Sequence, residues 1–173
     1  MSDDVGLAFT PEDFAEFAKT RDESIVLGIT IGLELEARSR SFYQSLLKKL
    51  PPDTAVILKL LANEELDHLK TLLAFQTALK KNDRWMALTP QQTRRIRAPR
   101  LYEGKGGVPF IEADASAQDI VLAGMRAEKR TEQFYRRVEQ KVRDPKAKAF
   151  FAFLARFERG HYALLKGILE SVA

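Results

Sequence analysis

The sequence predicts an all-α fold in which four long helices form two antiparallel hairpins joined by a long crossover. Four segments carry apolar residues at helical spacing, prolines separate the two helices of each hairpin, and no segment alternates with the period of two that is typical of strands. The chain has 173 residues, which is enough for one domain with a sizeable core. We therefore expect residues 1–173 to form a single domain.

The first hairpin is predicted to comprise helices over about 24–50 and about 53–80. Proline cannot continue a helix, so the Pro51–Pro52 pair should end the first of them, and Asp53 is expected to cap the second. A short connection makes these two helices antiparallel neighbours. A short helix over about 11–20 is expected to precede them.

The second hairpin is predicted over about 116–142 and about 146–171. Asp144–Pro145 separates its helices, because aspartate caps a helix and proline suits the first turn. A proline- and glycine-rich crossover over about 81–116 joins the hairpins. A crossover between hairpins has to run the length of a long helix, about 40 Å, and this explains its length.

The composition excludes several kinds of site. The sequence contains no cysteine, so disulfides, thiolate zinc sites, cysteine-ligated iron–sulfur centres and thiol nucleophiles are ruled out. Only two histidines, His68 and His161, are available. The longest apolar run, Ile25–Leu33, is far shorter than a membrane helix, and the acidic N-terminus is unlike a secretory signal. We expect a cytoplasmic protein with no membrane partner.

Two surface features bear on partners. The net charge is +4, and residues 81–105 alone carry +5, so the basic character belongs to the crossover. We favour a solvated loop there over a nucleic-acid site. The last helix carries phenylalanines on more than one side, at Phe150, Phe151, Phe153 and Phe157. Such a helix must be covered, by the crossover or by a second copy, and we expect a homodimer.

The two halves of the chain repeat one pattern of polar residues. Each half has a glutamate, a tyrosine seven residues later, and a Glu-x-x-His motif on its second helix. The residues are Glu36, Tyr43, Glu65 and His68 in the first half, and Glu128, Tyr135, Glu158 and His161 in the second. The two glutamates of a half are 29 residues apart in the first and 30 in the second. This shared register indicates an internal repeat.

The glutamates and histidines of the repeat interrupt the apolar stripes of the four helices. Glu158 and His161, for example, fill gaps in the stripe that contains Leu154. Burying unpaired carboxylates costs several kcal/mol, so four of them need neutralising charges. Two divalent cations supply these, and a glutamate and a histidine three residues apart share one helix face. Such ligands suit iron or manganese, and zinc less specifically.

The sequence resembles the rubrerythrin branch of the ferritin-like di-metal proteins over about residues 24–171. Three stretches carry this resemblance: Gly32–Tyr43, Leu61–His68 and Ala127–Tyr135. It implies a ferritin-like four-helix bundle that holds two Fe ions, or Mn or Zn, through Glu36, Glu65, His68, Glu128, Glu158 and His161. It also implies that Glu65 and Glu158 each share one metal with their own histidine, while Glu36 and Glu128 bridge or flank both metals.

The sequence departs from the rubrerythrin pattern in two respects. The four cysteines of a rubredoxin domain are absent, so we expect the chain to lack that domain and to use an unidentified electron donor. The extra glutamate that rubrerythrins carry on the third helix is replaced by Thr131, which makes the adjacent Glu132 a further candidate ligand. Arg40 is the counterpart of Glu132 in the repeat, and a salt-bridging or surface role for Glu132 is the favoured one.

Three more residues flank the predicted ligands. Tyr43 and Tyr135 are expected to be packed tyrosines that form hydrogen bonds near the site. Glu64 is predicted to be peripheral, because its counterpart in the repeat is Phe157.

The resemblance implies a non-haem di-iron oxidoreductase that reduces hydrogen peroxide or O2. Two alternatives are a ferroxidase that binds and stores iron, which needs a many-subunit cage, and a helical interaction module without metal.

Overall fold

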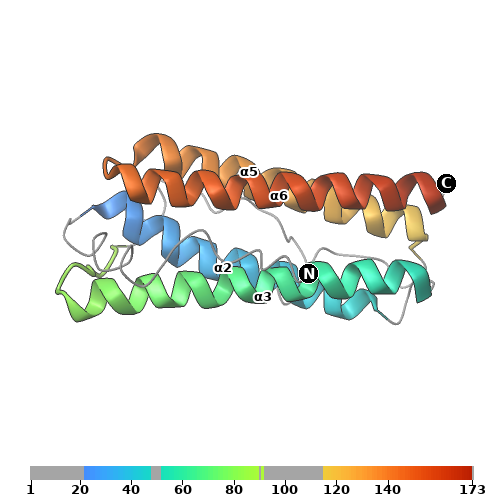
Figure 1. The fold of residues 1–173 in the computed structure, drawn as a ribbon, viewed down its shortest axis with the longest axis horizontal. Helices are drawn as coiled ribbons and strands as arrows, with labels where there is room; N and C mark the ends of the chain where they lie inside the picture. Colours follow the sequence, from blue (N-terminus) through green and yellow to red (C-terminus); the bar gives the residue numbers. More distant parts are fainter. Residues whose placement is uncertain (1–21, 48–51, 90, 92–114, 173) are drawn as a thin grey trace, which may run out of the picture.

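The computed structural model describes residues 22–47, 52–89, 91 and 115–172, and it has the predicted four-helix architecture (Figure 1). The helices are α2 (Glu23–Leu46), α3 (Pro52–Lys81), α5 (Ala117–Lys141) and α6 (Pro145–Val172). Helices α2 and α3 form one antiparallel hairpin, and α5 and α6 form the other. Across the hairpins, α2 packs on α5 and α3 packs on α6. The predicted short helix over 11–20 and most of the crossover lie outside the described residues.

Local capping explains where the helices begin. Ser116 and Asp119 form a reciprocal capping box at the start of α5. Asp144 Oδ1 accepts hydrogen bonds from the backbone N–H groups of Lys146 at 2.9 Å and Ala147 at 2.8 Å, so Asp144–Pro145 starts α6 as predicted. The predicted cap at Asp53 is wrong, because α3 already begins at Pro52.

The ends of the first hairpin therefore differ from the prediction. Proline has a fixed φ and no N–H group, and it fits the first turn of a helix as well as it ends one, so Pro52 belongs to α3. Helix α2 ends at Leu46, with Leu47 as its C-cap, rather than near residue 50. Within the described residues, no helix is long and apolar enough to cross a membrane.

The core consists of two apolar layers along the bundle axis. One layer is built around Ile29, Phe75, Val138 and Phe151, and the other around Phe42, Leu61, Val121 and Leu165. Each of the four helices contributes to both layers. On α2, α3 and α6 the repeated glutamates and histidines lie between the two stretches that the helix contributes, and on α5 Glu128 directly follows Ala127, the first residue of that helix in the layer around Phe75. The fold thus places a polar layer at mid-height in an otherwise apolar bundle.

Two of the clustered phenylalanines on α6 are covered by the chain itself. Phe150 and Phe151 are fully buried, and Phe150 stacks on Phe75 of α3 with ring centroids 4.4 Å apart. Phe151 lies against Gly28 of α2, where an added Cβ would be 2.7 Å from its Cζ. These two rings therefore need no second copy of the chain to cover them. Phe153 and Phe157 are only partly buried.

Candidate metal centre

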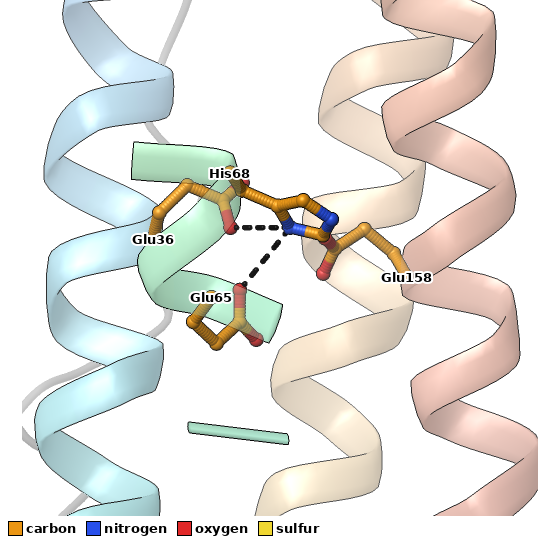
Figure 2. Close-up of side chains that lie close together, drawn as sticks. All are labelled: Glu36, Glu65, His68 and Glu158. Carbon is orange, nitrogen blue, oxygen red and sulfur yellow. Dashed lines mark hydrogen bonds and ion pairs between the residues drawn. The ribbon is translucent and has the colours of Figure 1, made fainter. Parts of the chain in front are cut away.

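The polar layer brings all six predicted ligands together. Their side chains come from all four helices, and each residue is at most 3 % exposed. They form two overlapping groups of four whose ligand atoms lie within 4.8 Å of one another: Glu36, Glu65, His68 and Glu158 in one, and Glu65, Glu128, Glu158 and His161 in the other. Figure 2 shows the first group, with Glu36 and Glu65 both directed at the His68 ring.

The two groups share Glu65 and Glu158. Glu65 faces both histidines, because its Oε2 lies 3.5 Å from His68 Nδ1 and its Oε1 lies 3.3 Å from His161 Nδ1. The two imidazole rings stack with centroids 5.7 Å apart, so a carboxylate one helical turn from His68 reaches both. This arrangement differs from the expectation that Glu36 and Glu128 bridge or flank both metals, because Glu65 and Glu158 are the carboxylates common to the two groups.

Glu36 and Glu128 instead belong to one group each. Glu36 Oε2 lies 3.1 Å from His68 Nδ1, and Glu128 Oε2 lies 3.7 Å from His161 Nδ1. The other oxygen of each carboxylate accepts a hydrogen bond from a tyrosine of the opposite hairpin. Tyr135 Oη donates to Glu36 Oε1, and Tyr43 Oη donates to Glu128 Oε1. The tyrosines therefore hold these two carboxylates in place in the same way in both halves.

Several buried polar atoms of the cluster have no hydrogen-bond partner. Among the described residues these atoms include both carboxylate oxygens of Glu65 and of Glu158, together with Glu128 Oε2 and His161 Nδ1. Buried polar atoms are nearly always paired, so a concentration of unpaired ones marks a place for a ligand. Oxygen and imidazole atoms directed at one another need a positive charge between them. The donor set therefore fits two divalent cations.

Without a bound cation, burial and the neighbouring carboxylates favour protons on several residues of the cluster. Burial and the nearby Glu65 carboxylate raise the pKa of Glu36 to about 8. Burial alone would lower the pKa of His68, but the charge of Glu36 and the hydrogen bond to it raise that pKa to about 9. Burial and the surrounding carboxylates also hold the pKa of Glu158 well above its usual range. Cations must displace these protons in order to bind.

Glu132, the further candidate ligand, lies outside both groups. Its carboxylate accepts hydrogen bonds from Lys129 Nζ at 2.8 Å and from Arg159 Nε at 3.2 Å. Burial raises the pKa of Glu132, but these two cations lower it overall. The adjacent Thr131 is buried and donates its hydroxyl to the backbone oxygen of Ala127. Glu132 thus has the salt-bridging role favoured above.

The prediction that Glu64 is peripheral is wrong. Its Oε2 lies 2.8 Å from His161 Nε2, so it contacts a candidate ligand rather than lying apart. The repeat placed Phe157 at the equivalent position and suggested no polar role. Helical spacing places Glu64 one turn before His68 of its own helix, and only the packing of α3 on α6 brings it to His161.

A pocket of about 290 Å³ opens beside the cluster between α3 and α6. Its lining residues are Leu60, Asn63, Glu64, Asp67, His68, Phe153 and Phe157. His68 belongs both to this lining and to the buried cluster. The pocket therefore reaches the edge of the candidate metal site.

The chain matches the family model described as Rubrerythrin over residues 28–169. This match spans most of the chain and all six residues of the cluster, and the protein belongs to the rubrerythrin family. Neither the search of curated proteins nor the search of solved structures found a match.

Proposed function

We propose that this protein is a non-haem di-iron oxidoreductase of rubrerythrin type that reduces hydrogen peroxide or O2. The observation that carries the proposal is the pair of overlapping ligand groups that share Glu65 and Glu158 inside a rubrerythrin-family bundle. Glu36 and His68 would complete one metal position, and Glu128 and His161 the other. When bound, two Fe(II) ions supply Lewis acidity and the two electrons that, with two protons, convert hydrogen peroxide to two waters.

The chain's own residues prepare the site for this chemistry. The hydroxyls of Tyr43 and Tyr135 each fix one carboxylate oxygen, so Glu128 and Glu36 present their other oxygen to the cluster. The apolar layers above and below exclude bulk water, which strengthens electrostatic interactions inside. The pocket between α3 and α6 has room for a small oxidant. We propose that a separate protein or small molecule supplies the electrons, since the 173 residues contain no cysteine to ligate an iron–sulfur donor.

The test is anaerobic loading with two Fe(II) per chain followed by rapid mixing with hydrogen peroxide or O2. We expect ferric absorbance to rise faster than in a matched solution of free Fe(II), and faster with peroxide if the protein is a peroxidase. Glu158→Gln keeps the size of the side chain but removes a charge that both groups share, so it should abolish the rapid phase. Oxidation no faster than that of free iron would contradict the proposal.

The same experiment separates the alternatives. Continued uptake and oxidation of many Fe(II) per chain, by a many-subunit assembly, would favour iron storage. A metal-free module predicts that the wild-type chain binds no Fe(II), and that Glu65→Ala only stabilises the fold by removing a buried charge. Two bound metals per wild-type chain, and fewer in the variant, would exclude that alternative.

A further inference from the structure

The two ring nitrogens of His161 have different surroundings. Nδ1 faces the cluster, 3.3 Å from Glu65 Oε1, and has no hydrogen-bond partner there. Nε2 faces outward and lies 2.8 Å from Oε2 of Glu64, whose side chain is 33 % exposed. A carboxylate accepts hydrogen bonds but does not donate them, so this contact keeps the hydrogen on Nε2. The Nδ1 lone pair is then directed at the cluster, as a metal ligand requires.

His68, the counterpart of His161 in the repeat, has no such support. Phe157 occupies the position equivalent to Glu64, and its ring meets the His68 ring edge-on with centroids 5.1 Å apart. Among the described residues, His68 Nε2 is buried without a hydrogen-bond partner. The aromatic contact packs the ring but accepts no hydrogen bond of the strength that a carboxylate does.

The two groups otherwise correspond across the repeat, except that Glu36 Oε2 lies 3.1 Å from His68 Nδ1 whereas Glu128 Oε2 lies 3.7 Å from His161 Nδ1. Each group has its own glutamate held by a tyrosine of the opposite hairpin, and both share Glu65 and Glu158. At the outer nitrogens of the two histidines, the difference is the exchange of Glu64 for Phe157.

We propose that Glu64 is a positioning residue that fixes His161 as an Nδ1 ligand and makes the two metal positions unequal. The position formed with His161 holds its cation more tightly than the position formed with His68. Hydrogen bonding of a carboxylate to the outer nitrogen orients the ring and raises its basicity as a ligand. This inference rests on the proposed di-metal site.

The test is a calorimetric titration of the metal-free protein with Co²⁺, which stays divalent in air. We expect two binding steps in the wild type. Glu64→Ala should weaken the tighter step by about 10- to 100-fold, the usual effect of losing such a support, and leave the weaker step nearly unchanged. Glu64→Gln keeps an acceptor oxygen and should recover part of the loss.

Asp67→Asn is the matched control. Asp67 lines the same pocket, but it is 59 % exposed and pairs with Lys70 rather than with a histidine. Asp67→Asn removes one negative charge, as Glu64→Ala does. Because solvent screens the exposed Asp67 carboxylate, Asp67→Asn should change the affinity of either Co²⁺-binding step by less than about threefold. Equal losses in Glu64→Ala and Asp67→Asn would indicate a general charge effect and overturn the proposal. Equal weakening of both steps in Glu64→Ala would also overturn it.

A second readout follows the tautomer directly. The chain has only two histidines, so nitrogen NMR of the zinc-loaded protein resolves each ring. We expect His161 to show a slowly exchanging hydrogen on Nε2 in the wild type, and to lose that protection in Glu64→Ala. No change in this signal would overturn the positioning role. A wild-type chain that binds fewer than two Co²⁺ would instead contradict the proposed di-metal site itself.

Discussion

Glutamates and histidines here occupy positions that leucine fills in an ordinary helical bundle. Glu65 and Glu158 are completely buried and leave all four of their carboxylate oxygens without hydrogen-bond donors among the described residues. A fold that only needed stability would place apolar side chains at these positions. The arrangement is instead that of a binding site, and the tyrosines show how it is held: each donates its hydroxyl to a carboxylate of the opposite hairpin.

Removing either tyrosine hydroxyl should destabilise the metal-loaded protein. Tyr135→Phe leaves Glu36 Oε1 without its donor, and Tyr43→Phe does the same to Glu128 Oε1. Loss of a hydrogen bond to a buried charged group costs about 1.5–3 kcal/mol. Denaturant titration of the zinc-loaded variants measures this as a lower midpoint.

Tyr162→Phe is the control for both variants. Tyr162 packs on the second apolar layer, and its hydroxyl makes no hydrogen bond to the described residues. Its removal should leave the free energy of unfolding nearly unchanged. A Tyr135→Phe variant as stable as Tyr162→Phe would show that the hydroxyl contributes nothing to holding Glu36.

Two glycines on α2 leave room for side chains of α5 and α6 to pack closely against this helix. Gly28 lies where an added Cβ would be 2.7 Å from both Phe151 Cζ and Val138 Cγ1. Gly32 lies beneath Tyr135, and an added Cβ would be 2.9 Å from the tyrosine Oη that reaches Glu36. These glycines let α5 and α6 approach α2 closely enough for the cross-hairpin hydrogen bonds.

Gly28→Ala should therefore lower the free energy of unfolding even though alanine favours helix. The helix gain is at most about 1 kcal/mol, whereas overpacking a well-filled core costs about 1–3 kcal/mol. Gly167→Ala is the matched control, because nothing lies within 4 Å of a Cβ added there on α6. Denaturant midpoints should fall for the first variant and rise for the second. A rise for both would mean that α2 has room to move away.

The stability of the whole bundle should depend on pH when metal is absent. The pKa values of Glu36 and His68 are raised from 4.5 to about 8 and from 6.5 to about 9. Raised pKa values contribute stability that is present at low pH and is lost as pH rises through the folded-state values. The steepest loss from these two groups should fall between pH 6.5 and 8, where Glu36 and His68 each keep a proton in the folded protein that they have released in the unfolded chain.

Urea unfolding of the chelator-treated protein at several pH values measures this effect. Each retained proton changes the free energy of unfolding by roughly 1.4 kcal/mol per pH unit. Metal affinity should rise with pH, because cations and protons compete for the same ligand atoms. Bound metal should therefore stabilise the protein most at high pH. A metal-free protein whose stability rises from pH 6.5 to 8 would contradict these pKa shifts.

Sequence patterns were enough to predict the architecture and the candidate donor set. Apolar spacing predicted four helices, Asp144–Pro145 indicated the start of the last one, and the repeat singled out six residues that the structure brings together. Periodicity suffices for this because residues three and four apart share one helix face. Pro51–Pro52 could either end one helix or begin the next, and for that reason the predicted start of α3 at Asp53 was wrong.

How the two candidate ligand groups share their residues depends on the packing of the four helices against one another. Spacing along one helix does not predict which oxygen of Glu65 faces which histidine. It also does not predict that Glu64 contacts His161 on another helix. Those contacts depend on the separation, rotation and axial offset of different helices. These are set by side-chain packing across the bundle, including the close approach at Gly28 and Gly32. A shift of one helix by an ångström or two would keep every sequence motif and change the ligand groups.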